Sequence, residues 1–313
     1  MGIYHFTGLG KLPGAVTSPL TVIYILLKSA EIGNPRAKDF FQYSGESGHS
    51  MKGVPECLVI FTSKGIINGM KPPTQVRSQL LPNKKFSGSV LSIMHDYLSS
   101  ITEALALNYV YKYGYIKKIY LIEVEYQNFD DCYPKANTFL YVYRDKECWI
   151  NAQAGSNQIN TALIISGSIN LISWKYYYVK QATTELLDIY FLKPDALKNP
   201  DQYVDKLLEV WGELHVFGLG INEVIRNLVD EFSSREKINI SELKRMLKEH
   251  GLGSIFLKYS GDSVSKSDQF DTFTQTFSNK WANLNNSSEV LAKAREKGIL
   301  YELGISTGKV LRP

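Results

Sequence analysis

Short apolar segments rich in β-branched and aromatic residues alternate with segments of helical periodicity over the first 190 residues, and no other feature constrains the fold as strongly. Strands are expected over residues 3–7, 57–62, 118–124, 147–152 and 174–179, and helices over 15–28, 90–110 and 159–171. Near-continuous apolar strands that alternate with helices are typical of a parallel sheet covered on both faces. The sequence therefore predicts an α/β fold with a Rossmann-like domain over residues 1–192.

The chain changes character near residue 192. A further strand is expected around residues 184–193, after which two prolines mark a linker. Helices are expected over residues 201–214, 222–232, 239–251 and 287–297. Residues 298–311 predict a hairpin, and the polar stretch 260–286 is interpreted as an insertion. Three helices followed by a hairpin form a winged-helix pattern, so residues 193–313 are predicted to be a second, mostly helical, winged-helix-like domain.

Cysteine usage and hydropathy narrow the class of protein. The chain has three widely spaced cysteines, Cys57, Cys132 and Cys148, without a CxxC pair, which excludes a disulfide scaffold and a cysteine-based zinc site. Neither a metal site nor a cofactor is expected. No signal peptide is visible, and the longest apolar stretch, residues 20–27, is about a third of a membrane-spanning helix. We expect a soluble, cytoplasmic protein with no membrane partner.

Charge is divided unevenly along the chain. Residues 1–185 carry 18 Lys and Arg against 13 Asp and Glu, a net charge of +5, whereas residues 186–313 carry 17 against 18, a net charge of −1. An anionic partner is therefore expected to bind the first part. The expected recognition helix of the winged-helix domain, residues 288–297, has three basic and two acidic residues. Together with the charge of the second part, this composition disfavours DNA binding.

The first candidate ligand loop follows the first expected strand. It consists of Gly8, Leu9, Gly10, Lys11, Leu12, Pro13 and Gly14. Three glycines let backbone N–H groups approach an anion, the start of the next helix adds partial positive charge, and Lys11 adds a full charge. The loop is neither a GxGxxG nor a Walker A motif, so neither NAD nor ATP is implied. A glycine-rich turn without a ligand explains the loop taken alone equally well.

The second candidate loop lies between a later strand and helix. It consists of Gln153, Ala154, Gly155, Ser156, Asn157 and Gln158. Its amide and hydroxyl groups suit base edges or phosphates, although a polar capping turn is the simpler interpretation of this loop alone. Ligands of open parallel sheets bind at the carboxyl ends of the strands, where both loops are expected. The pair therefore favours a nucleotide-like ligand.

These loops resemble those of CARF domains, the CRISPR-associated Rossmann folds. Residues 8–17, GLGKLPGAVT, resemble the family's first ligand loop, of the type Leu-Gly-Thr-Ser-Pro-x-x-Val-Thr, and residues 151–158 resemble its second. The resemblance covers residues 1–190. It implies a homodimer whose pocket, on the two-fold axis, binds cyclic oligoadenylate made by type III interference complexes. A CARF-like domain followed by a winged helix is similar to the stand-alone ring nucleases and to CARF transcription regulators.

The resemblance to ring nucleases also implies a reaction on cyclic tetra-adenylate that switches off type III signalling. A ribose 2′-OH attacks the neighbouring phosphate in line, without a metal, and the protein orients the groups and stabilises the developing charge. Lys11 and the amides of residues 10–14 would stabilise the phosphate. Ser156, Asn157 and Gln158 would position ribose or adenine. Lys11 and Ser156 are thus the catalytic candidates.

Two departures from the family pattern keep other functions open. Ring nucleases usually have Ser or Thr where this chain has Leu12, and their second loop often carries a cation that residues 153–160 lack. Binding without cleavage, as in a ligand-controlled transcription regulator, is one alternative. The other is a HEPN-type ribonuclease, because Arg245 and His250 have its Arg–His spacing. On a helix these two side chains would lie roughly 140° apart, so chance explains the spacing well.

Overall fold

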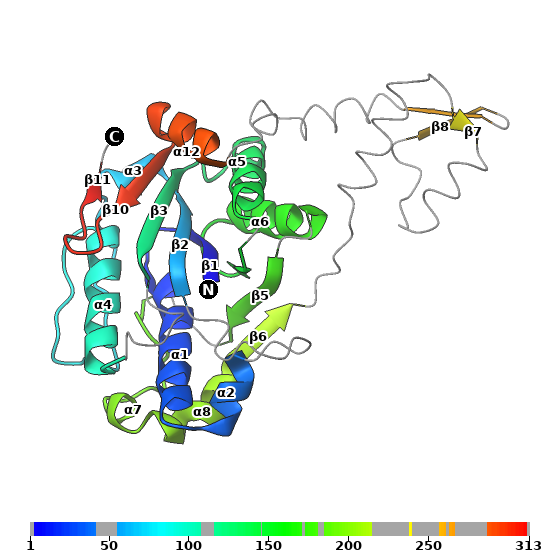
Figure 1. Cartoon of the computed structure of the whole chain (residues 1–313). Coiled ribbons are helices and arrows are strands. Elements are labelled where there is room, and N and C mark those ends of the chain that lie inside the picture. Colours follow the sequence, from blue (N-terminus) through cyan, green and yellow to red (C-terminus); the bar gives the residue numbers. More distant parts are fainter. Residues whose placement is uncertain are drawn as a thin grey trace.

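The computed structural model describes residues 3–41, 55–107, 116–144, 146–170, 173–180, 185–214, 238–239, 257–260, 263–266 and 287–311. An eight-stranded sheet forms its centre (Figure 1). The strands are β1 (Ile3–Leu9), β2 (Pro55–Thr62), β3 (Lys118–Glu123), β4 (Cys148–Asn151), β5 (Ser173–Val179), β6 (Trp211–Leu214), β10 (Leu300–Leu303) and β11 (Val310–Leu311).

The strand order is β11-β10-β3-β2-β1-β4-β5-β6. The inner strands β3, β2, β1, β4 and β5 are parallel, and β6, β10 and β11 are added in antiparallel pairing at the two sides. Successive strands extend the sheet in one direction from β1 to β3 and in the other from β4 to β5. This order confirms the predicted α/β class with a Rossmann-like parallel sheet, and its switch point lies between β1 and β4.

Helices cover both faces of the sheet, since its strands are apolar on both sides. One face carries α1 (Gly14–Glu31), α2 (Pro35–Phe41), α3 (Lys64–Ile67), α4 (Val90–Ala104), α7 (Asp195–Lys198) and α8 (Val204–Val210). The other face carries α5 (Phe129–Val142), α6 (Asn157–Asn170) and α12 (Ser287–Glu296). The tyrosines of β5 follow this arrangement, with Tyr176 buried on the second face and Tyr177 on the first, as expected for sheet packing.

Helix α1 is buried nearly all round, and only Ala15, Lys28 and Glu31 are not buried. The sheet covers one side of this helix. A short ladder covers part of the other side: the Arg77 N–H donates to the Glu185 carbonyl at 3.2 Å, and the Leu187 N–H donates to the Arg77 carbonyl at 2.8 Å. A helix that is apolar on all sides is stable only when it is enclosed in this way.

The C-terminal elements join the main sheet. β10 pairs antiparallel with β3, and β11 pairs with β10. Val290 and Ala294 of α12 are buried against the second face of the sheet. The predicted hairpin over residues 298–311 is therefore present. It forms an edge of the central sheet, so the prediction that this hairpin is the wing of a winged helix was wrong.

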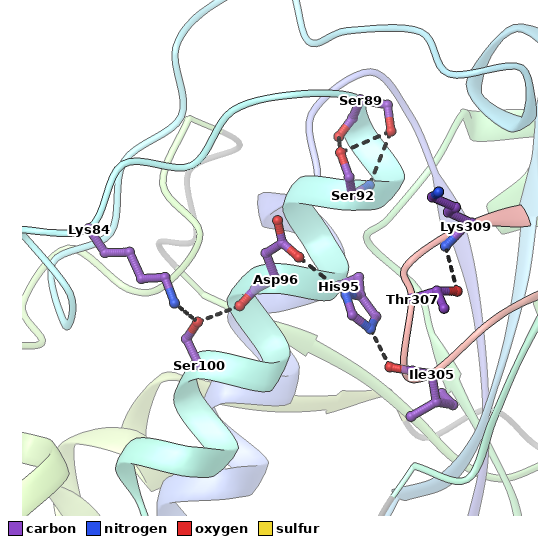
Figure 2. Close-up of polar contacts among 9 residues, drawn as sticks. All are labelled: Lys84, Ser89, Ser92, His95, Asp96, Ser100, Ile305, Thr307 and Lys309. Atoms are coloured by element: carbon purple, nitrogen blue, oxygen red, sulfur yellow. Dashed lines mark hydrogen bonds and ion pairs between the residues drawn. The ribbon is translucent and has the colours of Figure 1, made fainter.

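The turn of this hairpin packs on helix α4. Figure 2 shows His95 of α4 donating from Nε2 to the carbonyl of Ile305, with Asp96 beside the other ring nitrogen. Gly308 has φ +61°, and a Cβ there would lie 2.9 Å from Nδ1 of His95. A glycine is thus required by both the backbone and the close approach of the ring.

Two expected elements between residues 184 and 214 have a different structure. In place of a strand at 184–193, Leu186 makes an isolated parallel bridge to Arg77. The amphipathic segment 201–214 divides into a 3₁₀ turn (Pro200–Tyr203), α8 and the strand β6. The aromatic ring of Trp211 stacks on Tyr177 with 4.7 Å between centroids, so cross-strand packing outweighs the helical periodicity of this segment.

A second, three-stranded sheet has the order β7-β9-β8, from β7 (Ile238–Asn239), β8 (Leu257–Ser260) and β9 (Ser263–Lys266). The polar stretch 260–286, interpreted as an insertion, thus contributes part of a hairpin. The helices expected over 222–232 and 239–251 lie largely outside the described residues, as do Arg245 and His250. The division at residue 192 into two domains stays a prediction.

Candidate functional site

The two candidate loops lie side by side at the switch point of the sheet. β1 and β4 are parallel neighbours, with Phe6 paired to Ile150, and their carboxyl ends lead into α1 and α6. Gly8 and Leu9 belong to β1 rather than to the loop, which therefore consists of residues 10–13. The structure brings the first loop and residues 153–158 together at the edge where ligands of such sheets bind.

Gly8, near the end of β1, and Gly155 of the second loop are in close backbone contact. A Cβ on Gly8 would lie 2.4 Å from the Ala154 carbonyl oxygen and 2.7 Å from Cα of Gly155. Gly155 has φ +98°, which favours glycine, and a Cβ there would lie 2.8 Å from Cα of Gly8. These two glycines let the end of β1 and the second loop meet without a side chain between them. Gly10 has open space around it and no such constraint.

Asn151, the last residue of β4, links the two loops. Its Nδ2 donates to the carbonyl of Ala15 in the first turn of α1 at 3.0 Å, and its Oδ1 accepts from the Gln153 N–H at 3.0 Å. The side chain is buried, so both hydrogen bonds are shielded from water. Asn151 thereby sets the distance between the start of α1 and the second loop.

Two polar residues of the second loop form hydrogen bonds that hold the loop in place. Gln153 accepts at Oε1 from the Val179 N–H at 3.1 Å, which ties the loop to β5. Ser156 donates its hydroxyl to the Tyr126 carbonyl and accepts from the Ile159 N–H at 3.3 Å, in the manner of an N-cap. Its one hydroxyl hydrogen is used, so a catalytic role for Ser156 requires that this bond opens.

Three side chains of the two loops and the backbone at the start of α1 are the groups that could bind a ligand. Lys11 and Asn157 are exposed, and Gln158 is half-buried. Helix α1 begins at Gly14, and the N–H groups of Gly14 and Ala15 have no hydrogen-bond acceptor among the described residues. Backbone donors, a helix start and one lysine are a combination that binds an anion such as a phosphate.

A buried carboxylate anchors the segments around the first turns of α1. Asp188 accepts from the Ser78 hydroxyl at 2.6 Å, from the N–H groups of Gln79 and Leu80 at 2.9 and 3.1 Å, and from the Tyr97 hydroxyl at 3.3 Å. Burial raises the pKa of Asp188, and these hydrogen bonds oppose that rise. Burial, followed by the charge of Asp188, likewise raises the pKa of Tyr97.

The same segment is bonded directly to α1. Thr17 donates to the carbonyl of Leu187 at 2.6 Å, and Ser18 donates to the carbonyl of Asp188 at 3.2 Å. The first turn of α1 is therefore held on the outside by residues 187–188 and on the inside by Asn151. This support fixes the direction in which the N–H groups at the start of α1 point.

Sequence reasoning missed the residues that support the site. Asn151 was grouped with the second loop but not singled out, although an Asn directly after a buried strand is a usable signal for an Asx turn. Asp188 falls in a segment expected to be a strand, and its partners are about 110 residues away in the sequence. Helix α5 was not anticipated, although Asn128 caps it and two aspartates follow.

Three further findings concern metal sites, disulfides and membrane-spanning helices. Among the described residues, no group of three or more His, Cys, Asp or Glu side chains could hold a metal ion. Cys57, Cys132 and Cys148 are free and buried, in agreement with the prediction that the chain is not a disulfide scaffold. None of the helices that the structure describes has the length and apolar character needed to cross a membrane.

Comparison with known proteins gives one strong match. No family model matches the chain. An uncharacterized protein of Archaeoglobus fulgidus is 34% identical over 321 residues, which cover 98% of this chain and 98% of that protein.

Two solved structures are far more distant. Enterococcus italicus Csm6 bound to cyclic hexa-2′-fluoro-hexa-dAMP is 13% identical with a TM-score of 0.37, over 95% of this chain and 55% of the Csm6 chain. Protein VC1899 of Vibrio cholerae is 10% identical with a TM-score of 0.28, over 99% of this chain and 75% of that one. This chain thus spans about half of the length of Csm6, and both TM-scores are too low to establish a shared fold or function.

Proposed function

The chain belongs to the same family as the Archaeoglobus fulgidus protein, and from the chemistry of its site we propose that it is a CARF-type protein that binds cyclic oligoadenylate. The observation that carries this proposal is the contact between Gly8 and Gly155, which brings the end of β1, where the first loop starts, against the second loop at the switch point. The loop sequences that resemble those of CARF domains are the same two that meet there. The proposed ligand is cyclic tetra-adenylate, bound between two copies of the chain on a two-fold axis.

Ring opening is the proposed reaction. The ribose 2′-hydroxyl gives up its proton and its oxygen attacks the adjacent phosphorus. The bond to the 5′-oxygen breaks and that oxygen takes up a proton, so the products are a 2′,3′-cyclic phosphate and a 5′-hydroxyl. Lys11 and the N–H groups of Gly14 and Ala15 would stabilise the negative charge that builds on the phosphate. Asn157, Gln158 and Ser156 would hold ribose and base in the in-line arrangement. Cleavage in this way would end the signal in a type III CRISPR response.

The test is incubation of the purified chain with labelled cyclic tetra-adenylate and EDTA, followed by separation of bound, intact and linear species. Linear product is the expected result. Tight binding of an intact ring would contradict cleavage and leave a sensor, in line with Leu12 and the missing cation of the second loop. Absence of binding would contradict the proposal as a whole. Analytical ultracentrifugation with and without the ligand tests for the dimer.

Replacing Lys11 with alanine is expected to weaken binding of cyclic tetra-adenylate by about tenfold or more, because a charge-assisted contact to phosphate contributes roughly 1.5–3 kcal/mol. The measurement is a titration by isothermal calorimetry. Lys38→Ala removes an exposed lysine of α2 and serves as the matched control. Equal affinities of the two variants would remove Lys11 from the site.

A ligand-controlled regulator is the second candidate function. It stays open because Leu12 and the missing cation of the second loop depart from the ring-nuclease pattern, which favours binding without cleavage. Salt-dependent binding to duplex DNA would favour this candidate over ring opening. For the HEPN alternative, loss of RNA cleavage in Arg245→Ala would be the corresponding result.

A further inference from the structure

Tyr126 is an exposed aromatic side chain beside the second loop. Its exposed fraction is 42%. Among the large hydrophobic residues that the structure describes as exposed, Tyr126 and Tyr190 are the aromatic ones. Tyr126 follows β3, at the same edge of the sheet as both loops. An exposed aromatic ring at the edge where ligands of such sheets bind is available to stack on a ligand.

The turn that carries Tyr126 is braced on both sides. The Asn128 N–H donates to the Glu125 carbonyl at 2.7 Å, and the Glu125 N–H donates to Asp131 Oδ2 at 2.8 Å. The Glu125 carboxylate accepts from Nδ2 of Asn128 at 3.2 Å. The backbone of the exposed ring is therefore fixed before any ligand arrives, which lowers the entropic cost of binding to it.

A hydrogen bond joins this turn to the second loop. The hydroxyl of Ser156 donates to the carbonyl of Tyr126, although 30 residues separate them in the sequence. The same hydroxyl caps the first turn of α6. The backbone of Tyr126 is thus tied to Ser156, the residue that precedes Asn157 and Gln158 in the chain.

We propose that Tyr126 is a stacking platform for a base of the bound nucleotide ligand. This inference rests on the proposed function and names the residue that contacts a base. A purine offers a large ring face to the exposed tyrosine, while the amides of the second loop address its edge or the ribose. Stacking on Tyr126 adds affinity for the base.

The experiment compares the unchanged chain with Tyr126→Ala, Tyr126→Phe and Tyr190→Ala. The probe is cyclic tetra-adenylate in which one adenine is replaced by 2-aminopurine, whose fluorescence falls on stacking. Tyr126→Ala is expected to raise Kd about tenfold or more and to abolish most of the quenching. Tyr126→Phe keeps the ring and is expected to keep both. Tyr190→Ala removes the other exposed tyrosine and is expected to change neither.

The outcomes separate this inference from the proposed function. If the unchanged chain binds the probe and Tyr126→Ala binds it equally well with equal quenching, the stacking platform is wrong and the proposed function stands. If the unchanged chain binds no probe, both are wrong. Thermal unfolding of each variant excludes misfolding, since removal of an exposed side chain is expected to leave the midpoint within a few degrees.

Discussion

Replacing Gly8 with alanine is expected to lower the free energy of unfolding by about 3 kcal/mol and to abolish ligand binding. The new methyl group would lie 2.4 Å from the carbonyl oxygen of Ala154 and 2.7 Å from Cα of Gly155. Both contacts are with backbone, so no side chain can move aside, and the end of β1 has to separate from the second loop. Because β1 continues through Gly8 into the first loop, the damage falls on the site itself.

Gly10→Ala is the matched control for this variant. Gly10 lies two residues further on, has no atom within 4 Å of a built Cβ, and is expected to accept alanine within about 0.5 kcal/mol. The measurement is urea unfolding of both variants together with a binding titration. A Gly8→Ala protein that is as stable as Gly10→Ala would show that the two loops do not pack as described.

Replacing Asp188 with alanine is expected to destabilise the fold by about 3 kcal/mol, since it removes the acceptor of two backbone N–H groups and two hydroxyls at once. The ladder outside α1 would loosen, and the first turn of α1 would lose its outer support. Binding of an anion to the start of α1 is expected to weaken as well. Asp201→Ala, at an exposed aspartate of the 3₁₀ turn, is the control and is expected to be neutral.

The contribution of Asp188 depends on pH in a defined direction. Burial raises its pKa in the folded protein above the ordinary value of 3.8, so the folded state holds the proton to a higher pH than the unfolded chain does. Below 3.8 both states are protonated and the stabilisation is fully present; it is lost as the pH rises through the pKa of the folded state. The stability difference between the unchanged chain and Asp188→Ala should therefore be largest in acid. A difference that grows from acid to neutral pH would contradict this sign.

The parallel sheet was predictable from sequence because its signals are local. Residues 57–62 and 118–124 are apolar runs of strand length, and the helices between them have clear periodicity. The turn at Gly10 and Lys11 also followed from a strand and the glycines after it, whereas Gly8 was assigned to the loop and lies in β1. The sequence could therefore predict where a ligand loop begins.

The support of the site was not predictable in this way, because it depends on contacts between distant segments. Asp188 meets residues 78–80 and Tyr97, and Ser156 meets the carbonyl of Tyr126. The hairpin at residues 300–311 carries a correct local signal, yet nothing in its own residues says that β3 is its partner. Local pattern predicts the elements, whereas pairing between elements is decided by packing.

The pairing of β10 with β3 has a consequence for the way the protein is made. During synthesis, the five parallel strands leave the ribosome well before residues 300–311, and until then β3 has an unpaired backbone edge. At about 5–20 residues per second, the roughly 90 residues between β6 and β10 take several seconds to emerge. The nascent chain is therefore most exposed to aggregation in that interval, and fragments that stop before residue 300 should require chaperones to remain in solution.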